Sequence, residues 1–209
     1  MDIERIYQEI WELARPYYQK GRAYDVPHIV WMMREANRIA DLEGLEKKLL
    51  LPIVILHDVG YSAVGNNNPN IKDKNSKIAH MAEGARIAED ILRKVDYDTD
   101  LSKKIMDFIS VHDNWILGDD SPYKKCKEIA VFQDLDFLYS QSSYEIFKKQ
   151  AASIGKKPEE MWEFWLNDEK LTRRPFCCAE TLKLFKRYME ERYEDIKKIL
   201  LDFRMPKSD

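Results

Sequence analysis

The feature that most constrains this chain is an apolar run, Leu49 to Leu56, that ends abruptly in the polar doublet His57-Asp58. Such a run enters a core, so the imidazole and the carboxylate are delivered to a buried position. Both groups are costly to desolvate and must find partners there, and a bound metal cation suits both. Neighbouring side chains on a helix diverge by about 100°, so His57 and Asp58 can bind the same ion only near a helix end. Gly60 is expected to supply that end in the left-handed conformation that closes a helix, and the alternative is a buried His57–Asp58 hydrogen bond.

The composition is typical of a soluble globular protein and argues against several classes of function. The 209 residues are 44% hydrophobic and 34% charged, and this length is enough for one domain with a sizeable core or for two small ones. The net charge of −3, with both signs interspersed, argues against a dedicated nucleic-acid surface. No apolar stretch reaches the length of a membrane span and the chain begins polar and acidic, so we expect no membrane segment and no signal peptide. Three cysteines without framework spacing fit a reducing cytoplasm, the expected location.

Apolar residues recur with helical spacing along most of the chain. Helix start signals are Asp25-Val26-Pro27, Ser76 and Asp98, and Pro52 either kinks a helix or marks its beginning. The sequence therefore predicts an all-α fold, a single domain over residues 1–209, with a helical core at about 24–140 and a C-terminal helical extension at about 141–205. The first expected helix begins at about residue 2 and ends near Pro16 or shortly after. The others span about 26–42, 45–59, 76–95, 98–112, 124–139, 142–153, 158–168 and 177–202.

Three other stretches carry open alternatives. The polar segment 60–75 is too long for a simple connection and is more typical of a lid or binding loop. The aromatic segment 161–166 either packs over the core or forms the wall of a substrate pocket. The adjacent Cys177 and Cys178 are interpreted as helix-core residues, with a redox sensor as the alternative.

The chain has only four histidines, His28, His57, His80 and His112, and each lies at the beginning or end of an expected helix. None falls in the last 97 residues, as counted from His112. Side chains from several helices can converge at helix ends, and imidazole is a preferred ligand of divalent transition metals. Each histidine alone is more typical of a hydrogen-bonded core residue. Together, with Asp58 beside one of them and Asp136 inside an apolar helix, they predict a metal site.

This pattern resembles the HD-domain metal-dependent phosphohydrolases. Their pattern is a histidine opening an early helix, a His-Asp doublet ending the next one and a later aspartate, with two further histidines in members that bind two metals. The similar positions here are His28, His57-Asp58, His80, His112 and Asp136. The resemblance covers residues about 24–140 and uses every histidine present.

The chain departs from that family pattern at two places. It has Asp134-Leu135-Asp136-Phe137-Leu138-Tyr139 where members often have Asp-Ala-Asp-Arg-Leu-Asp. The ligand role is therefore placed on Asp136, with Asp134 as the fallback. The residues after the doublet, Val59-Gly60-Tyr61, lack the acidic residues that some nucleotide-cleaving members have there.

The resemblance implies a metal-dependent phosphohydrolase that cleaves a phosphate ester of a nucleotide or other small phosphorylated metabolite by metal-activated water. One ion would be held by His28, His57, Asp58 and Asp136, and a second by Asp58, His80 and His112. Asp58, His80 and His112 are then the catalytic candidates. The cofactors would be one or two divalent ions of Fe, Mn, Zn, Co or Ni, with Mg as a further candidate.

Cationic contacts to the substrate phosphate are expected from the basic residues Lys72, Lys74, Lys77 and Arg34, whose alternative is a solvated charged surface. Asp113 either orients His112 or caps a helix end.

The same ligand set is compatible with a diiron oxygenase that resembles inositol oxygenase, and a non-catalytic metal-stabilised sensor is a third hypothesis. The expected partner is a small phosphorylated substrate, and the aromatic C-terminal helices offer a candidate homodimer face.

Overall fold

The computed structural model describes residues 3–64 and 73–202. Every regular element in these two ranges is a helix, and no strand occurs among them. The predicted all-α fold class is therefore confirmed. The chain separates into two compact units, Met1–Gln133 and Asp134–Asp209. The helix α7 (Lys127–Tyr139) begins in the first unit and ends in the second, and the single-domain organisation stays a prediction.

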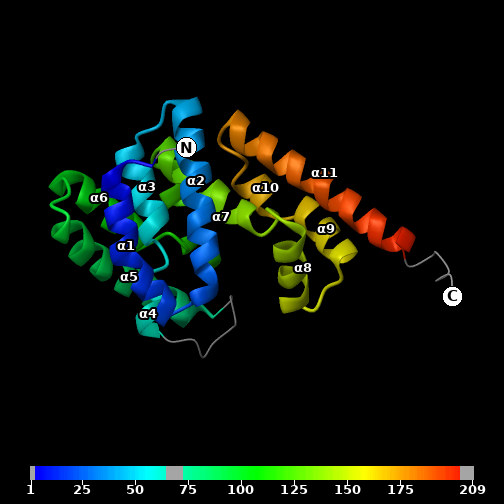
Figure 1. Ribbon diagram of the computed structural model, residues 1–209, viewed down its shortest axis with the longest axis horizontal. Coiled ribbons are helices and arrows are strands. Elements are labelled where there is room, and N and C mark those ends of the chain that lie inside the picture. Colours follow the sequence, from blue (N-terminus) through cyan, green and yellow to red (C-terminus); the bar gives the residue numbers. More distant parts are fainter. Residues whose placement is uncertain (1–2, 65–72, 203–209) are drawn as a thin grey trace. The chain divides into compact units, whose positions relative to one another are not determined.

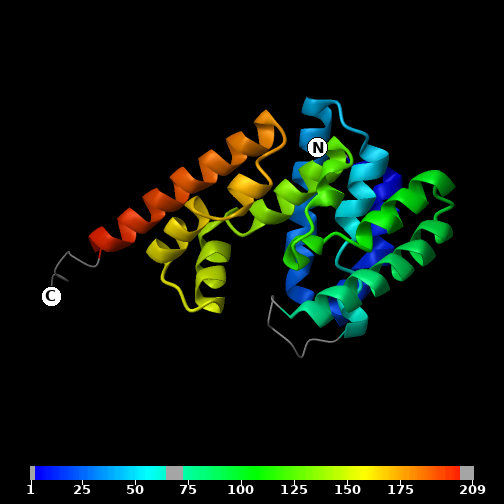
Figure 2. The same ribbon diagram turned by 180° about the vertical axis from the view of Figure 1, so that it is seen from behind.

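The first unit consists of a central helix surrounded by others. Helix α3 packs against α1, α2 and α6, while α5 lies beside α6 in both views (Figure 1, Figure 2). Short 3-10 turns, η1 to η3, connect these helices. The elements are α1 (Arg5–Lys20), η1 (Ala23–Asp25), α2 (Val26–Glu43), α3 (Lys47–Leu56), α4 (Tyr61–Val64), α5 (Lys74–Lys94), α6 (Thr99–Ile109), η2 (Asn114–Leu117) and η3 (Ser121–Lys124).

Helix α3 occupies the centre because its sequence is apolar on all sides, as in a helix buried on every face. Residues 50–60 are all buried. Pro52 lies inside α3 and does not mark its beginning. Proline lacks the N–H that would have bonded the carbonyl oxygen of Lys48, four residues earlier. The hydroxyl of Tyr97 donates to that oxygen instead, over 2.8 Å.

Two helix ends differ from the predicted ones. Helix α5 is capped by Asp73, whose carboxylate accepts from the backbone N–H of Ser76 over 3.1 Å, so the predicted Ser76 cap is wrong. Helix α6 ends at Ile109 and leaves His112 in the turn that follows. The segment 60–75 contains the short helix α4, and residues 65–72 of it lie outside the described residues.

The second unit packs α8 (Tyr144–Ser153) and α9 (Pro158–Leu166) against the long helix α11 (Ala179–Asp202), with the short α10 (Lys170–Arg173) between α9 and α11 in the chain. In the aromatic segment, Met161 and Trp165 are buried in this unit, and the Trp165 ring lies 4.8 Å from that of Phe137. The core-packing alternative therefore holds for these two residues, whereas Phe164 and Leu166 of the same segment are exposed.

The cysteine pair does not belong to a helix core. Cys177 and Cys178 are half-buried free thiols that precede α11, which begins at Ala179. The prediction of helix-core cysteines is therefore wrong at this pair. The backbone N–H of Cys177 donates to the Asp134 carboxylate over 2.9 Å, so a residue of α7 fixes the segment that precedes α11.

A fully buried ion pair joins α7 and α10 inside the second unit. The Lys170 ammonium donates to Asp134 over 2.5 Å, and the two side chains are 0% and 1% exposed. The Asp134 carboxylate also accepts from the hydroxyl of Thr181 over 2.7 Å. The ammonium lies 3.7 Å from the centre of the Phe176 ring, a cation–π contact.

Replacing Lys170 with methionine is expected to lower the free energy of unfolding by about 3 kcal/mol, because it leaves a buried carboxylate without its countercharge. The double variant Lys170→Met/Asp134→Asn should recover part of that loss, since asparagine is neutral and still accepts hydrogen bonds. Lys148→Met is the control, because Lys148 is half exposed and pairs with Glu145 on the surface. Urea unfolding measures all three. A loss no larger than that of Lys148→Met would contradict the expected role of this pair.

Candidate metal centre

All four histidines are buried in the first unit, and each is positioned by a different helix. His28 lies in the first turn of α2, His57 directly follows α3, His80 lies in α5 and His112 follows α6. Their exposed fractions are 7%, 1%, 0% and 2%. The convergence expected from the helix ends is therefore present.

The approach of α5 to the end of α3 depends on Gly60. A Cβ atom at this position would lie 1.9 Å from the carbonyl oxygen of His80 and 2.5 Å from the backbone nitrogen of Gly84. Gly60 is not among the left-handed glycines, so its predicted role in closing the helix is wrong. It is required because two backbones touch there, and that contact brings His80 next to His57-Asp58.

Three of the imidazoles use Nδ1 to hold a backbone carbonyl oxygen. A carbonyl only accepts, so Nδ1 carries a proton in each ring. Nε2 faces the interior, where it donates while the imidazole is protonated and offers a lone pair to a metal ion once the imidazole is neutral. The pairs are His57 with Val54 at 3.0 Å, His80 with Ser76 at 3.2 Å and His112 with Ile109 at 2.7 Å.

Three ligand atoms meet at one point of the site. Nε2 of His80 lies 3.1 Å from Nε2 of His112, and Oδ1 of Asp58 lies 3.4 Å and 3.3 Å from these two nitrogens. Tetrahedral ligands about 2.0–2.1 Å from a metal ion are about 3.3–3.4 Å apart. The two distances to Asp58 match this spacing and the distance between the two nitrogens is slightly shorter, so this buried group could hold a metal ion.

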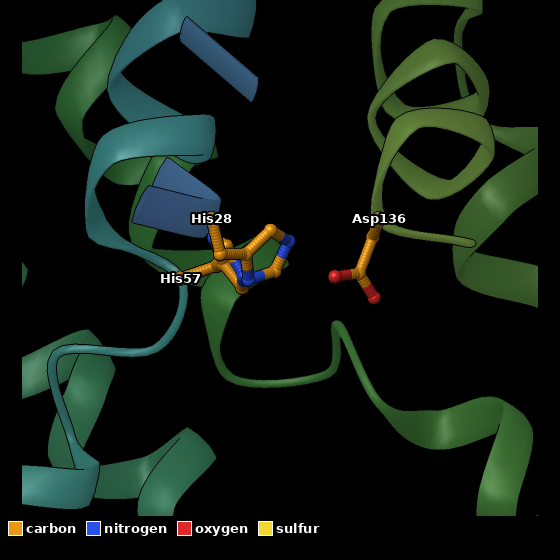
Figure 3. A group of neighbouring side chains, drawn as sticks. All are labelled: His28, His57 and Asp136. Carbon is orange, nitrogen blue, oxygen red and sulfur yellow. The ribbon is translucent and has the colours of Figure 1, made fainter. Parts of the chain in front are cut away.

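The second oxygen of Asp58 faces another histidine. Oδ2 lies 3.6 Å from Nε2 of His57, so the two carboxylate oxygens are directed at different imidazoles. The His28 ring lies 5.6 Å from the His57 ring, edge to face (Figure 3). Asp25, His28 and Asp58 form a second buried group that could hold an ion. Asp58 therefore has the placement of a bridging carboxylate.

The electrostatics of the site keep Asp58 ionised. Burial alone raises the pKa of its carboxyl, but the charge of His57 and the hydrogen bonds of His112 and His80 outweigh burial and hold the pKa well below its ordinary value. Burial also lowers the pKa of His80. Burial acts in the same direction on His112, but the neighbouring Asp58 and Asp113 outweigh it and raise the pKa of that imidazole.

Asp113 is a further buried carboxylate beside the cluster. Its Oδ2 lies 3.5 Å from Nε2 of His80 and accepts from the ammonium of Lys77 over 2.5 Å. Oδ1 accepts from the indole N–H of Trp115 over 2.9 Å. Asp113 thus neither holds Nδ1 of His112 nor caps η2 with its side chain. Burial raises the pKa of its carboxyl, and the charge of Lys77 outweighs that effect and lowers it.

The four basic residues expected near the phosphate differ in placement. Lys77 is part of the buried network, whereas Lys74 is exposed. The Arg34 side chain is 62% exposed and lies 3.4 Å from the Glu35 carboxylate. Lys72 lies outside the described residues.

Sequence reasoning missed two residues of the site, Arg22 and Tyr61. The guanidinium of Arg22 pairs with Asp25 at 2.9 Å and lies 4.1 Å from the centre of the Tyr61 ring. The spacing of Arg22 and Asp25, three residues apart, was the available signal for the first. Nothing in the local sequence pattern identifies Tyr61.

The two candidate aspartates of α7 differ in their surroundings. The Asp134 carboxylate accepts from Lys170, Thr181 and the Cys177 backbone, so its oxygens are used inside the second unit. Asp136 lies two residues further along α7 and is labelled in Figure 3. The fallback assignment of Asp134 as a ligand is not supported.

The fold and the site define an all-helical protein with buried histidine and aspartate groups suited to a divalent metal ion. The HD-domain family model matches residues 26–132, slightly more than half of the chain. The chain therefore belongs to the HD-domain family, and HD domains bind divalent metals. No curated protein matches the chain.

The solved structures include a similar protein, described as a predicted HD superfamily hydrolase from an uncultured Thermotogales bacterium. It is 18% identical, with a TM-score of 0.56 over 94% of this chain and 90% of that one. This likeness shows the fold. Among the described residues, no helix is both long enough and apolar enough to traverse a bilayer.

Proposed function

We propose that this protein is a metal-dependent phosphohydrolase that cleaves a phosphate ester of a nucleotide or another small phosphorylated metabolite. The observation that carries the proposal is the carboxylate of Asp58, with Oδ1 at 3.3–3.4 Å from His112 and His80 and Oδ2 at 3.6 Å from His57. A carboxylate shared between two groups of imidazoles suits two neighbouring ions, the arrangement used for phosphoryl transfer to water.

The proposed ligands fall into two sets that share Asp58. His28, His57, Asp58 and Asp136 would hold the first ion, and Asp58, His80 and His112 the second. The assignment of Asp136 is supported by the helical period of α7. Phe132 packs its ring 5.0 Å from that of His57, and Asp136 follows four residues later on the same face of the helix.

The donor set indicates which ions are suitable. Imidazole nitrogen and carboxylate oxygen favour Fe, Mn, Zn, Co or Ni, whereas Mg usually prefers oxygen ligands and water. When bound, such ions would supply hydroxide from water near neutral pH and neutralise charge on the phosphoryl oxygens.

The residues of this chain would orient the reaction and attract its substrate. The carbonyl-bound Nδ1 atoms fix the tautomer and the direction of His57, His80 and His112. Lys77 is the best-placed candidate contact to a phosphoryl oxygen because its ammonium lies next to Asp113 inside the network. Lys74 and Arg34 are candidates for more distant parts of a substrate.

The test is hydrolysis of a generic aryl phosphate by protein that has been freed of metal and reloaded with each divalent ion in turn. We expect turnover with at least one transition-metal ion, retained without oxygen when Mn²⁺ is used and abolished by a chelator. Iron-dependent absorbance that develops in air, with no hydrolysis under any ion, would contradict the proposal and favour an oxygenase with the same ligands.

A further inference from the structure

The side chain of Tyr61 is held between a cation and a candidate ligand. Its ring is stacked on the His80 imidazole, with centroids 4.1 Å apart and planes 9° from parallel. The guanidinium of Arg22 lies 4.1 Å from the centre of the same ring. Two groups cannot occupy the same position 4 Å above one face, so Arg22 and His80 cover opposite faces. Tyr61 is itself buried, with 9% exposure.

The outer layer of this stack is itself fixed in place. The Arg22 guanidinium contacts the Asp25 carboxylate with two nitrogens, at 2.9 Å and 3.1 Å. The backbone approach of Gly21 to Ser62 brings the two segments together, because a Cβ at Gly21 would lie 2.6 Å from the Ser62 nitrogen. The ion pair with Asp25 and the close approach of Gly21 to Ser62 therefore both fix the position of Arg22 against the Tyr61 ring.

His80 is the imidazole that most needs such a support. Its Nδ1 contact to a carbonyl, at 3.2 Å, is the longest of the three, compared with 3.0 Å for His57 and 2.7 Å for His112. The Nδ1 contact and the Nε2 contacts to Asp58 and His112 all lie at the polar edge of the ring, whereas stacking on a buried aromatic ring supports its face and fixes its plane. The plane of the ring decides where Nε2 is directed.

We propose that Tyr61 is a positioning residue that holds the His80 imidazole in the orientation required to bind the second metal ion. The inference rests on the dinuclear centre of the proposed function but not on its hydrolytic chemistry. Tyr61 itself touches no reacting group. Its aromatic ring provides the support, and the phenolic hydroxyl is not needed for it.

The experiment compares Mn²⁺ binding by Tyr61→Leu and Tyr61→Phe, measured by titration calorimetry on metal-free protein. We expect the unmodified protein and Tyr61→Phe to bind two equivalents. In Tyr61→Leu the second equivalent should bind on the order of 10–100-fold more weakly, as when a residue that orients a ligand is lost, while the first is unchanged. Tyr7→Leu is the matched control, because Tyr7 is a buried tyrosine of the same unit outside the site.

Rescue by phenylalanine separates orientation from general packing. If Tyr61→Leu binds both ions as tightly as the unmodified protein, or if Tyr7→Leu weakens the second ion equally, the inference is overturned although the dinuclear centre stands. Fewer than two equivalents in the unmodified protein would overturn the proposed centre together with this inference. If Tyr61→Leu does not fold, Arg22→Gln removes the cation from the stack and keeps a hydrogen-bonding side chain. It should weaken the second ion several-fold, and unchanged binding would then overturn the inference.

Discussion

Replacing Asp58 with asparagine is expected to abolish metal-dependent hydrolysis, with kcat/KM lower by about 10³-fold or more, equivalent to about 4 kcal/mol of barrier. The amide is neutral, and its NH₂ group repels a cation, so it cannot replace a carboxylate whose two oxygens face His57 on one side and His80 and His112 on the other. Neither proposed ion would keep its full ligand set. Kinetics with an aryl phosphate and metal analysis of the same preparation measure both effects.

The matched control for this substitution is Asp113→Asn. Asp113 is equally buried and lies beside the same imidazoles, but it is bonded to Lys77 and Trp115 and is not a proposed ligand. Loss of the Asp113 carboxylate should reduce activity by about 10–100-fold while two ions remain bound, which is the range typical of residues that orient metal ligands. An Asp58→Asn protein that binds two ions and turns over like Asp113→Asn would contradict the bridging role.

Gly60→Ala is expected to have the largest effect on folding, with the free energy of unfolding lower by about 3 kcal/mol or more. The added methyl group would lie 1.9 Å from the His80 carbonyl oxygen and 2.5 Å from the Gly84 nitrogen, and both are backbone atoms that cannot rotate away. The end of α3 and the helix α5 would have to separate. Metal binding should then fail as well, because His80 moves away from Asp58. Urea unfolding and the yield of soluble protein measure the effect.

Gly84→Ala is the control on the opposite side of the same crossing. A Cβ there would lie 3.3 Å from a side-chain methyl of Ile109 and 3.4 Å from the His57 carbonyl oxygen, distances that a small shift accommodates. Alanine also favours a helix by about 1 kcal/mol over glycine. We therefore expect Gly84→Ala to remain close to the unmodified protein in stability. Equal loss of stability in Gly60→Ala and Gly84→Ala would contradict the expectation that only Gly60 lacks space for a methyl group.

Local patterns in the sequence were sufficient to predict the helical fold and the burial of the histidines. Apolar spacing placed α2 and α3 to within a few residues, and the apolar run before His57 placed the doublet in the core. These features depend on the chain only over one or two turns, where helical periodicity is informative.

The contacts that shape the site could not be predicted in this way because they join distant segments. Tyr61 and Arg22 are 39 positions apart, as counted from their numbers, and meet only because Gly21 allows the close approach of their segments. The expectation for Gly60 failed for a similar reason. A glycine at this position of the sequence can either close a helix or allow two backbones to touch. Only the position of α5 in the structure shows that Gly60 has the second role.

The two aspartates of α7 illustrate the same limit of local patterns. Asp134 and Asp136 are two residues apart in an apolar helix, so the sequence leaves both open as ligands. In the structure the fully buried Lys170 engages Asp134, and the local sequence of Lys170 is that of an ordinary charged surface residue. The HD-domain assignment, by contrast, depended on the order of the motifs and is confirmed over residues 26–132.

The most direct test of the metal centre is the metal content of protein purified without added metal and then equilibrated with Mn²⁺. We predict two equivalents per chain in the unmodified protein and a loss of bound metal in His57→Ala, which removes a proposed ligand that is 1% exposed. A protein that retains no metal and takes up none would contradict the account and would leave the four histidines as hydrogen-bonded residues of the core.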